Sequence, residues 1–466
     1  MSHASFFLAC PGRGVGVLGL IFSLTALVAG AADDPKGAKP GAVVGKCVAS
    51  TVLLHHGGPL GKGWEVVPTG PVKSEDLLVG ATGAVLDSKD GAVRMSFLGD
   101  LDGLSPYPVK EVAVILHENA EVDLDFTLER GRVDLVNRKE KGPAQVRIHV
   151  RDHVFDVKLN DPGTRMAFEI YGRWLKGTRF RKELKPPELP KLPLPKPPLP
   201  PLPGVQKDPR PEQVPLAEMV VLVLKGEAEL KHGSKVHAME APPGAARIHW
   251  NSESGFDPSP LCLDKLPEWA TAADIISPEA RARFLKFRKI LTEKSLGDAL
   301  EAFINSDSAD ERRLAVFAMA ALDDLPRLGL AVATTKHEDV LENATLALRQ
   351  WIGRGPGQDQ KLYAGLIVVA KYPPIMAETL VQFLHSFSDE DLSHPETYEM
   401  LIDFLEHERV GPRFLAYWHL ERLVPVGKKF GYHALDPKEK REQAIEQWKK
   451  LIPHGKLPPR ATPEDK

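Results

Sequence analysis

The segment Lys185–Gly204, KPPELPKLPLPKPPLPPLPG, limits what the middle of this chain can fold into. Half of its residues are prolines, which have no amide hydrogen to donate and a fixed φ angle. The segment therefore cannot join the hydrogen-bond ladder of a sheet, and we expect it to extend as polyproline II over roughly 60 Å, at about 3.1 Å per residue. We interpret it as a stiff spacer or exposed loop; the alternative is a docking peptide with Pro-x-x-Pro spacing.

Alternating apolar and polar residues predict β-strands on both sides of this segment. Before it, Val122, Leu124, Phe126 and Leu128 alternate with polar residues, a period of two that places apolar side chains on one face. After it, Val220–Leu224 has the composition of a strand. The Pro-rich segment is therefore expected to interrupt one β region.

Two stretches of this β region resemble each other. Leu128–Leu135 and Val223–Leu230 each contain a glycine, Gly131 or Gly226, followed by apolar residues two and four positions later. Short strands at close spacing, separated by turn residues, are typical of a sandwich or a solenoid-like β fold.

From about Ser277 the apolar period becomes helical. Ser277 and Pro278 are typical of an N-cap followed by proline at the first helical position. Helices are expected at Ala280–Lys294, Leu296–Ile304, Asp310–Leu322, Val340–Ile352, Gln360–Val369, Ala377–Phe387, Pro395–Glu406, Pro412–Leu423 and Pro437–Leu451.

These helices show weak self-similarity. Arg313–Leu322 is similar to Arg413–Leu420, and the steps Arg349-Gln350-Trp351 and Glu446-Gln447-Trp448 occupy comparable places in two later helices. The pattern resembles HEAT-type or armadillo-type repeats, which bury their apolar stripes by stacking on neighbours. A compact bundle of short helices is the alternative.

The predicted fold class is thus α+β and multidomain: an N-terminal all-β domain, a sandwich or solenoid-like, followed by an all-α helical-repeat or bundle domain. The expected divisions are a signal peptide at 1–31, a flexible N-terminus at 32–46, a β domain at 47–183, a Pro-rich insertion at 184–215, the second part of the β domain at 216–255, a linker at 256–276, a helical domain at 277–453 and a disordered tail at 454–466.

The N-terminal residues are typical of an export signal. Arg13 precedes the apolar run Val15–Val28, and small residues then lead to an expected cleavage between Ala31 and Ala32. The alternative is an uncleaved membrane anchor, because the run approaches the length of a spanning helix. Export predicts a periplasmic or secreted protein, with membrane contact only if the run is not cleaved.

Cleavage would leave two cysteines, Cys47 and Cys262. In an oxidising compartment these two residues are candidates for a disulfide, and the alternative is two unpaired thiols. Metal binding by either is less favoured, since neither has a second Cys or His at ligand spacing.

Three stretches of the β region resemble the periplasmic domain of FecR-type proteins, the iron-dicitrate regulator family: Ala84–Met95, Leu128–Leu135 and Asn160–Phe168. The resemblance extends over roughly Cys47 to Trp250. It implies a non-enzymatic, periplasmic sensing or adaptor domain.

Familiar catalytic motifs are absent from the sequence. His55–Gly63 contains Gly-Lys, but it lacks the spacing and the following Ser or Thr of a phosphate-binding loop. His117-Glu118 and His407-Glu408 lack the second histidine of a zinc protease, and no Gly-x-Ser-x-Gly elbow occurs. We therefore predict no cofactor, no metal site and no enzyme.

One acidic strand face allows two interpretations. Asp123, Asp125 and Glu129 lie at alternate positions, so they would share one face of a strand. A cation site or an acid/base pair is one interpretation, and a solvated outer face is the other, because alternation alone explains the pattern.

A basic and aromatic stretch precedes the Pro-rich segment. This composition suits binding to an anionic polymer or stacking on rings, whereas the alternative is a charged edge strand that resists pairing. The candidate binding residues are Arg173, Trp174, Lys176, Arg179, Phe180, Arg181 and Lys182.

The leading functional prediction is an exported, non-catalytic interaction or sensing protein with an envelope protein as partner and an anionic glycan as a candidate ligand. A net charge of −3 over 466 residues predicts no nucleic-acid partner. The alternatives are a membrane-anchored envelope sensor and an enzyme that acts on envelope polysaccharide through two facing carboxylates.

Overall fold

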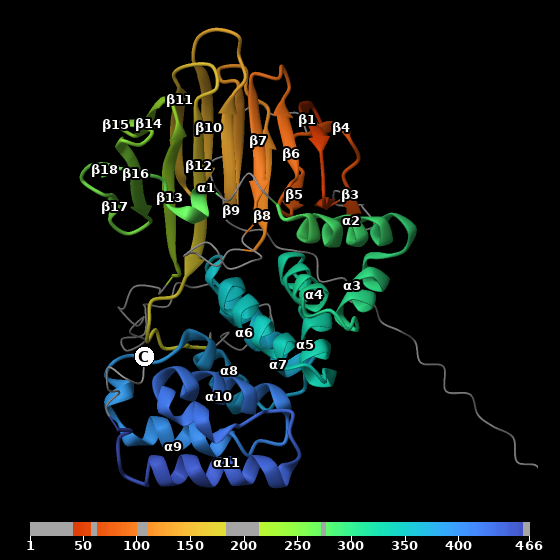
Figure 1. Ribbon diagram of the computed structural model, residues 1–466, viewed down its shortest axis with the longest axis vertical. Helices are drawn as coiled ribbons and strands as arrows, with labels where there is room; N and C mark the ends of the chain where they lie inside the picture. The colour runs from red at the N-terminus through yellow and green to blue at the C-terminus, as the bar shows by residue number, and fades with distance from the viewer. Residues whose placement is uncertain (1–40, 57–62, 100–109, 183–213, 272–275, 460–466) are drawn as a thin grey trace, which may run out of the picture. The chain divides into compact units, whose positions relative to one another are not determined.

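The computed structural model describes residues 41–56, 63–99, 110–182, 214–271 and 276–459. Strands occupy the described chain from Val43 to Leu263, and helices follow from Pro278 to Leu451, which confirms the predicted α+β fold class (Figure 1). These residues belong to one compact unit, 37–466. The predicted signal peptide at 1–31, its cleavage point between Ala31 and Ala32, and residues 184–213 of the Pro-rich insertion lie outside the described residues.

The strands form two sheets, which we name sheet A and sheet B. Sheet A runs in the order β4 (Gly70–Lys73), β1 (Val43–Ala49), β6 (Val85–Ser88), β7 (Val93–Leu98), the second half of β9 (Leu124–Asn137), β12 (Arg165–Arg173), β13 (Leu216–Lys225) and β16 (Gly244–Asn251), with β17 (Gly255–Phe256) and β18 (Leu261–Leu263) on its last edge. Sheet B runs β3 (Trp64–Val66), β2 (Leu53–His56), β5 (Leu77–Gly80), β8 (Val112–His117), the first half of β9, β10 (Ala144–Val150), β11 (His153–Leu159), β14 (Glu227–His232) and β15 (Lys235–Glu240). The β9–β10 pair is parallel, and the other pairs of the described strands are antiparallel.

Glycine corners carry the chain from one sheet to the other. β9 pairs with β8 of sheet B up to Arg130 and with β12 of sheet A from Gly131 onward. Gly131 has φ +88°, and a Cβ there would lie 2.1 Å from the carbonyl oxygen of Glu111, so only glycine fits. Gly226, with φ +76°, lies between β13 of sheet A and β14 of sheet B. The similarity between the two sequence stretches therefore reflects two equivalent corners.

The Pro-rich segment separates two strands that are neighbours in sheet A. β12 and β13 pair antiparallel along their length, from Arg165 opposite Lys225 to Arg173 opposite Leu216. On sheet B, β11 from before the segment pairs with β14 from after it. The strands before and after residues 183–213 therefore belong to the same two sheets.

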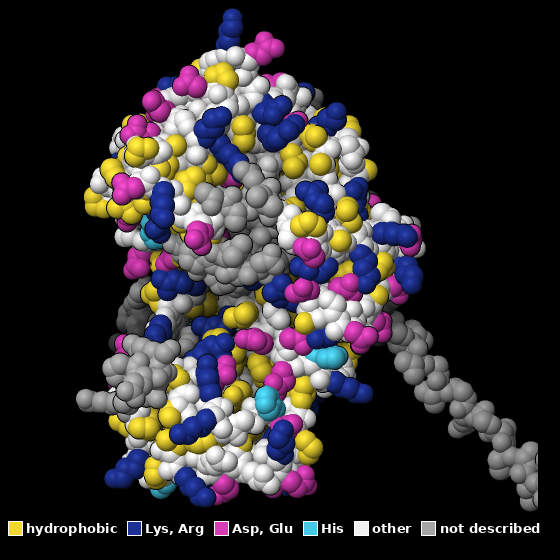
Figure 2. Space-filling view, viewed as in Figure 1, with side chains coloured by type: hydrophobic (Ala, Val, Ile, Leu, Met, Phe, Trp, Pro, Cys, Tyr) yellow, Lys and Arg dark blue, Asp and Glu magenta, His cyan; other side chains and the backbone are white. Residues whose placement is uncertain are grey.

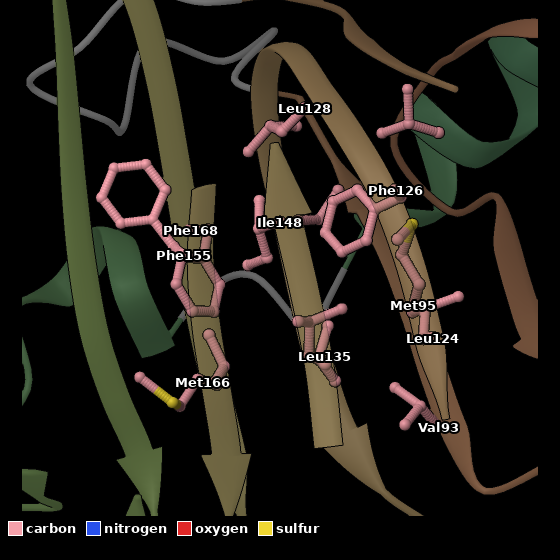
Figure 3. Close-up of a cluster of buried hydrophobic side chains, with 14 of the residues drawn as sticks. Val93, Met95, Leu124, Phe126, Leu128, Leu135, Ile148, Phe155, Met166 and Phe168 are labelled. Atoms are coloured by element: carbon pink, nitrogen blue, oxygen red, sulfur yellow. The ribbon is translucent and has the colours of Figure 1, made fainter. Parts of the chain in front are cut away.

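The β core lies between the two sheets and follows the alternation in the sequence. Phe126, Ile148 and Phe155 of sheet B and Leu135 and Phe168 of sheet A are all completely buried in one cluster (Figure 3). Intervening residues of the same strands point away from this cluster, as the period of two requires. The β region is therefore a sandwich with one continuous core.

The predicted helices are present, with their ends shifted by up to three residues. Ser277 caps the first of the long helices, because its side chain accepts a hydrogen bond from the Ala280 amide. Two α-helices that the sequence pattern did not predict are α1 (Glu268–Thr271) and α5 (Leu325–Thr334), and the two short 3-10 helices η2 (Asp391–Ser393) and η3 (Pro425–Phe430) were not predicted either. The remaining elements are α2 (Pro278–Glu293), α3 (Leu296–Ile304), α4 (Ala309–Ala321), α6 (Glu338–Gly353), α7 (Gln358–Val368), α8 (Pro374–His385), α9 (Pro395–Phe404), α10 (Val410–Leu423) and α11 (Lys438–Leu451).

Helix α10 is central to the later helices. It packs against α5, α6, α8 and α9, and its residues Leu415, Ala416 and Leu420 are buried in the core that these helices share. The earlier helices α2, α3 and α4 belong to a separate core. The helical region thus has two cores, whereas the sandwich has one between its sheets and a smaller cluster in which Ala167, Val220 and Leu222 of sheet A pack with Ala270 of α1.

Three predicted boundaries require correction. The N-terminus expected to be flexible at 32–46 includes the start of β1 at Val43. The linker expected at 256–276 contributes β18 to sheet A, and in α1 the carbonyl oxygen of Trp269 accepts a hydrogen bond from Nη1 of Arg132 at 3.0 Å. In the tail expected at 454–466, the Gly455 amide donates to Oε1 of Glu399 at 2.6 Å.

Candidate functional site

The predicted anionic-polymer site, Arg173–Lys182, continues from the end of β12 along helix α8, and we name it the strap. Nε1 of Trp174 donates to the carbonyl oxygen of Ile352 at 2.9 Å, and its ring stacks on His385 with 4.7 Å between centroids. Phe180 is only 6% exposed. The two aromatic rings of the strap therefore pack in the core of the helical region.

The cations of the strap face carboxylates of the same chain. The pairs are Arg173–Glu218 (2.6 Å), Lys176–Asp389 (2.5 Å), Arg179–Asp391 (2.8 Å) and Lys182–Glu378 (3.2 Å). Figure 2 likewise shows Lys and Arg interspersed with Asp and Glu on the face in view, without one large basic patch.

The strap therefore makes contacts within its own chain, and binding of an anionic polymer stays a prediction. Six strap side chains contact other parts of the chain: Arg173, Trp174, Lys176, Arg179, Phe180 and Lys182. The carbonyl oxygen of Arg181 accepts a hydrogen bond from Gln360 at 2.6 Å. Gly177, with φ +80°, allows the close approach, since a Cβ there would lie 2.5 Å from Cα of Ser388. Alternating cations and aromatics serve here to attach two regions of one chain.

A buried ion cluster joins sheet B to the helices. Oε1 of Glu111 lies 2.9 Å from Nε of Arg130 and 2.5 Å from Nη2 of Arg354. Arg130 and Arg354 also donate to the last carbonyl groups of α4, those of Ala321 and Ala320. Burial works to raise the pKa of Glu111, but the charges of Arg354 and Arg130 outweigh it and hold the pKa below its ordinary value.

A small apolar pocket of about 50 Å³ lies beside this cluster, between sheet B and helices α2 and α4. Its walls include Leu54 and Val79 from the sheet and Phe284, Phe287 and Phe317 from the helices. The Glu111 cluster lines one side of the pocket. Glu111 pairs with both guanidinium groups, and Asp323 also pairs with Arg354 at 3.2 Å, so two carboxylates balance the two cations within the fold.

A second polar cluster crosses the outer face of sheet B. Nδ1 of His117 lies 2.8 Å from Glu75 Oε1, and its Nε2 lies 2.7 Å from Thr127 Oγ1. On β10, which lies on the other side of β9, Nε2 of His149 lies 2.8 Å from Oδ1 of Asp125. Sequence analysis missed this cluster, because only the strand register brings β8, β9 and β10 side by side.

The acidic residues of the strand face therefore separate into different surroundings. Asp123 pairs with Lys139 at 2.7 Å, Asp125 is 7% exposed, and Glu129 is exposed. Burial works to raise the pKa of Asp125, but hydrogen bonds from His149 and Asn119 outweigh it and lower the pKa below its ordinary value. These carboxylates do not form a shared site.

Histidines and aromatic rings gather at one end of the sandwich core. Nδ1 of His153 lies 3.2 Å from Nε2 of His232, whose ring stacks on Phe155 with 4.7 Å between centroids. Trp250 packs edge-on against His153 at 4.9 Å. Burial, together with the neighbouring His153, lowers the pKa of His232.

Of the two alternatives for Cys47 and Cys262, the structure has the unpaired thiols. Cys47 is a buried free thiol of β1, and Cys262 is an exposed free thiol of β18. In sheet A the strands β6, β7, β9, β12, β13 and β16 lie between β1 and β18. At about 4.8 Å per strand the two cysteines are roughly 30 Å apart, whereas a disulfide requires Cα atoms within about 7 Å.

An exposed apolar surface lies at the turn between α7 and α8. Val368 is 64% exposed, Val369 55% and Ile375 79%, and Pro373 and Pro374 between them are exposed as well. We name these five residues the α7–α8 surface. A backbone hydrogen bond closes the turn that carries this surface: the Tyr372 amide donates to the carbonyl oxygen of Leu366 at 3.0 Å.

Neither a protein-family model, nor a curated protein, nor a solved structure matches this chain. Within the described ranges, no group of three or more His, Cys, Asp or Glu side chains is arranged to hold a metal ion. Among the helices of the described residues, none has both the length and the apolar character needed to cross a bilayer.

Proposed function

We propose that this is an exported, non-catalytic interaction protein that binds an envelope protein through the α7–α8 surface. The exposure of Ile375, Val368 and Val369 carries the proposal. Single exposed apolar residues are common on protein surfaces, but three large ones around one tight turn are typical of a contact site. The partner is therefore expected to present an apolar side chain to this turn.

The strap supports this proposal because it fixes the helices that carry the surface. Phe180 packs against Tyr363 of α7 with 5.4 Å between ring centroids, and its amide donates to Gln382 of α8 at 2.8 Å. A surface on two anchored helices loses little conformational entropy when a partner binds. In this proposal the β sandwich serves as the rigid support from which the α7–α8 surface is displayed.

In the same proposal the buried charges serve the fold. Glu111 and Asp323 pair with the guanidinium groups of Arg130 and Arg354, and His117 is held between Glu75 and Thr127. The sequence resemblance of the β region to FecR-type domains and the apolar run Val15–Val28 are the reasons for placing the protein in the periplasm or outside the cell. The location of the protein is therefore part of the proposal.

Site-specific photo-crosslinking in the native envelope tests the partner surface. A photoreactive amino acid at position 375 is expected to give one discrete adduct, and Val368→Asp in the same chain is expected to reduce that adduct at least tenfold. Val236 on β15, which is 55% exposed, is the matched control position. Equal adducts from positions 375 and 236, or an adduct that Val368→Asp leaves unchanged, would exclude the α7–α8 surface.

A further inference from the structure

The contact between His153 and His232 has the geometry of a pair of metal ligands. The two side chains come from adjacent strands, because β11 and β14 pair with Phe155 opposite His232. Their nitrogens Nδ1 and Nε2 lie 3.2 Å apart. Two imidazole nitrogens that bind one ion at about 2.0–2.1 Å, at tetrahedral or octahedral angles, are themselves about 3.0–3.4 Å apart.

The surroundings hold both rings in this orientation. Phe155 stacks on the ring of His232, and Trp250 packs edge-on against His153. Oδ1 of Asp152 lies 3.4 Å from Nε2 of His153, the nitrogen that points away from His232. A carboxylate on the far nitrogen favours the tautomer in which Nδ1 carries the lone pair, which is the arrangement found behind histidine ligands of metals.

The site also has an unsatisfied polar atom nearby and access to water. His237 is on β15, which pairs with β14, and both His237 and His232 pack against Phe256. Nε2 of His237 is buried and makes no hydrogen bond within the described residues. The side chain of His153 is 28% exposed, so water can reach this ring.

We propose that His153 and His232 form a two-imidazole site for a divalent transition-metal ion, with water in the remaining positions. Imidazole ligands select Cu²⁺, Ni²⁺ and Zn²⁺ over Mg²⁺ and Ca²⁺, which prefer oxygen, and the general order of affinities places Cu²⁺ first. Two protein ligands make a weak and exchangeable site, not a structural one. This inference is independent of the α7–α8 surface, which lies in the helical region.

Calorimetric titration of the full chain with Cu²⁺, Ni²⁺, Zn²⁺ and Mg²⁺ tests the site. His153→Phe and His232→Phe keep an aromatic ring against Phe155 and Trp250 but remove the ligand nitrogen. Each is expected to weaken Cu²⁺ and Ni²⁺ binding at least tenfold, and Mg²⁺ is expected not to bind. His454→Phe is the matched control, because His454 is 95% exposed and far along the chain.

Electron paramagnetic resonance of the Cu²⁺ complex gives a second measurement that does not depend on affinity. Two histidine nitrogens are expected to couple to the copper in the native chain, and one in each single variant. Asp152→Asn is expected to weaken binding by a smaller factor than either Phe variant. Binding that both Phe variants leave unchanged, or a native chain that binds no more copper than the double variant, would overturn the proposal.

Discussion

The β region and the helical region bury their apolar residues in different ways. The core of the sandwich consists entirely of residues from the β region, between Val44 and Phe256. The helical region shares both of its cores with the β region: one includes Val52, Leu54 and Val79 of sheet B or its adjoining turn, and the other includes Phe180 of the strap. The sandwich is therefore self-contained in its packing, whereas the helices depend on it.

This difference shows what attaches the two regions. The contacts that connect them include the apolar packing of sheet B against α2 and α4, the buried ion cluster of Glu111, the apolar contacts of Phe180, and the exposed ion pairs of Lys176 and Arg179. Burial decides the expected losses, because removing one partner of a buried ion cluster or a buried ring costs much more than removing an ion pair in water. The mutations below test that order.

The largest effect is expected from Glu111→Ala. This change leaves Arg130 and Arg354 buried without their carboxylate, which for buried ion pairs costs about 3–5 kcal/mol in the free energy of unfolding. Urea denaturation followed by circular dichroism measures the loss, and Glu129→Ala on the exposed face of β9 is the control. A loss below about 1 kcal/mol would mean that the ion cluster does not stabilise the junction.

The next effect is expected from Phe180→Ala, which removes a buried ring of the strap from the helical core. Truncation of a buried Phe destabilises a protein by about 3 kcal/mol or more, and here the unfolding of the helices should be affected before that of the sandwich. Leu175→Ala, at a strap position that is 48% exposed, is the control. If both variants unfold alike, the helical region does not depend on the strap.

The two regions also differ in how far the sequence alone could predict them. Alternation in strands such as β10 and the N-cap at Ser277 are local signals, and they predicted the sandwich strands and most helices. Helix α5 was missed, because its short segment Leu325–Thr334 contains Pro326 and Gly329, which weaken the helical pattern. Local signals thus identify elements but not the contacts between them.

The candidate sites depend on contacts that no local pattern contains. His153 and His232 are 79 positions apart, and only the β11–β14 pairing brings them together. The strap was recognised as unusual in composition, but the carboxylate partners of Lys176, Arg179 and Lys182 lie about 200 positions later in the chain. The sequence therefore indicated where charge and aromatic residues concentrate, and the fold decided that they attach one region to the other.

Acid is expected to destabilise the helical region through His419 before the carboxylates of the sandwich titrate. Burial lowers the pKa of His419 to about 3, although its hydrogen bond to the Phe383 carbonyl opposes the shift. In the unfolded chain His419 therefore takes up a proton near pH 6.5, whereas in the folded chain it stays neutral. As a result the free energy of unfolding falls by about 1.4 kcal/mol per pH unit from pH 6.5 toward 3. Between pH 6.5 and 5 the expected loss is about 2 kcal/mol.

The pH effect can be separated between the regions by two variants. His419→Gln should flatten the pH dependence of the free energy of unfolding between pH 6.5 and 5, whereas His454→Gln, at an exposed site, should not. In the sandwich, burial also lowers the pKa of His232. Because His232 is partly exposed, its contribution to the pH dependence of the free energy of unfolding should be smaller than that of His419. An unchanged slope in His419→Gln would place the acid sensitivity in the sandwich.

The smallest effect is expected from the exposed ion pairs of the strap. Lys176 is 58% exposed and Asp389 93%, so water screens their attraction, and the double variant Lys176→Ala with Arg179→Ala should lose no more than about 1 kcal/mol. The loss should shrink further in 1 M salt, which leaves the effect of Phe180→Ala unchanged. A loss as large as that of Phe180→Ala would show that charge attaches the strap to α8; the expected difference would show that its buried ring does.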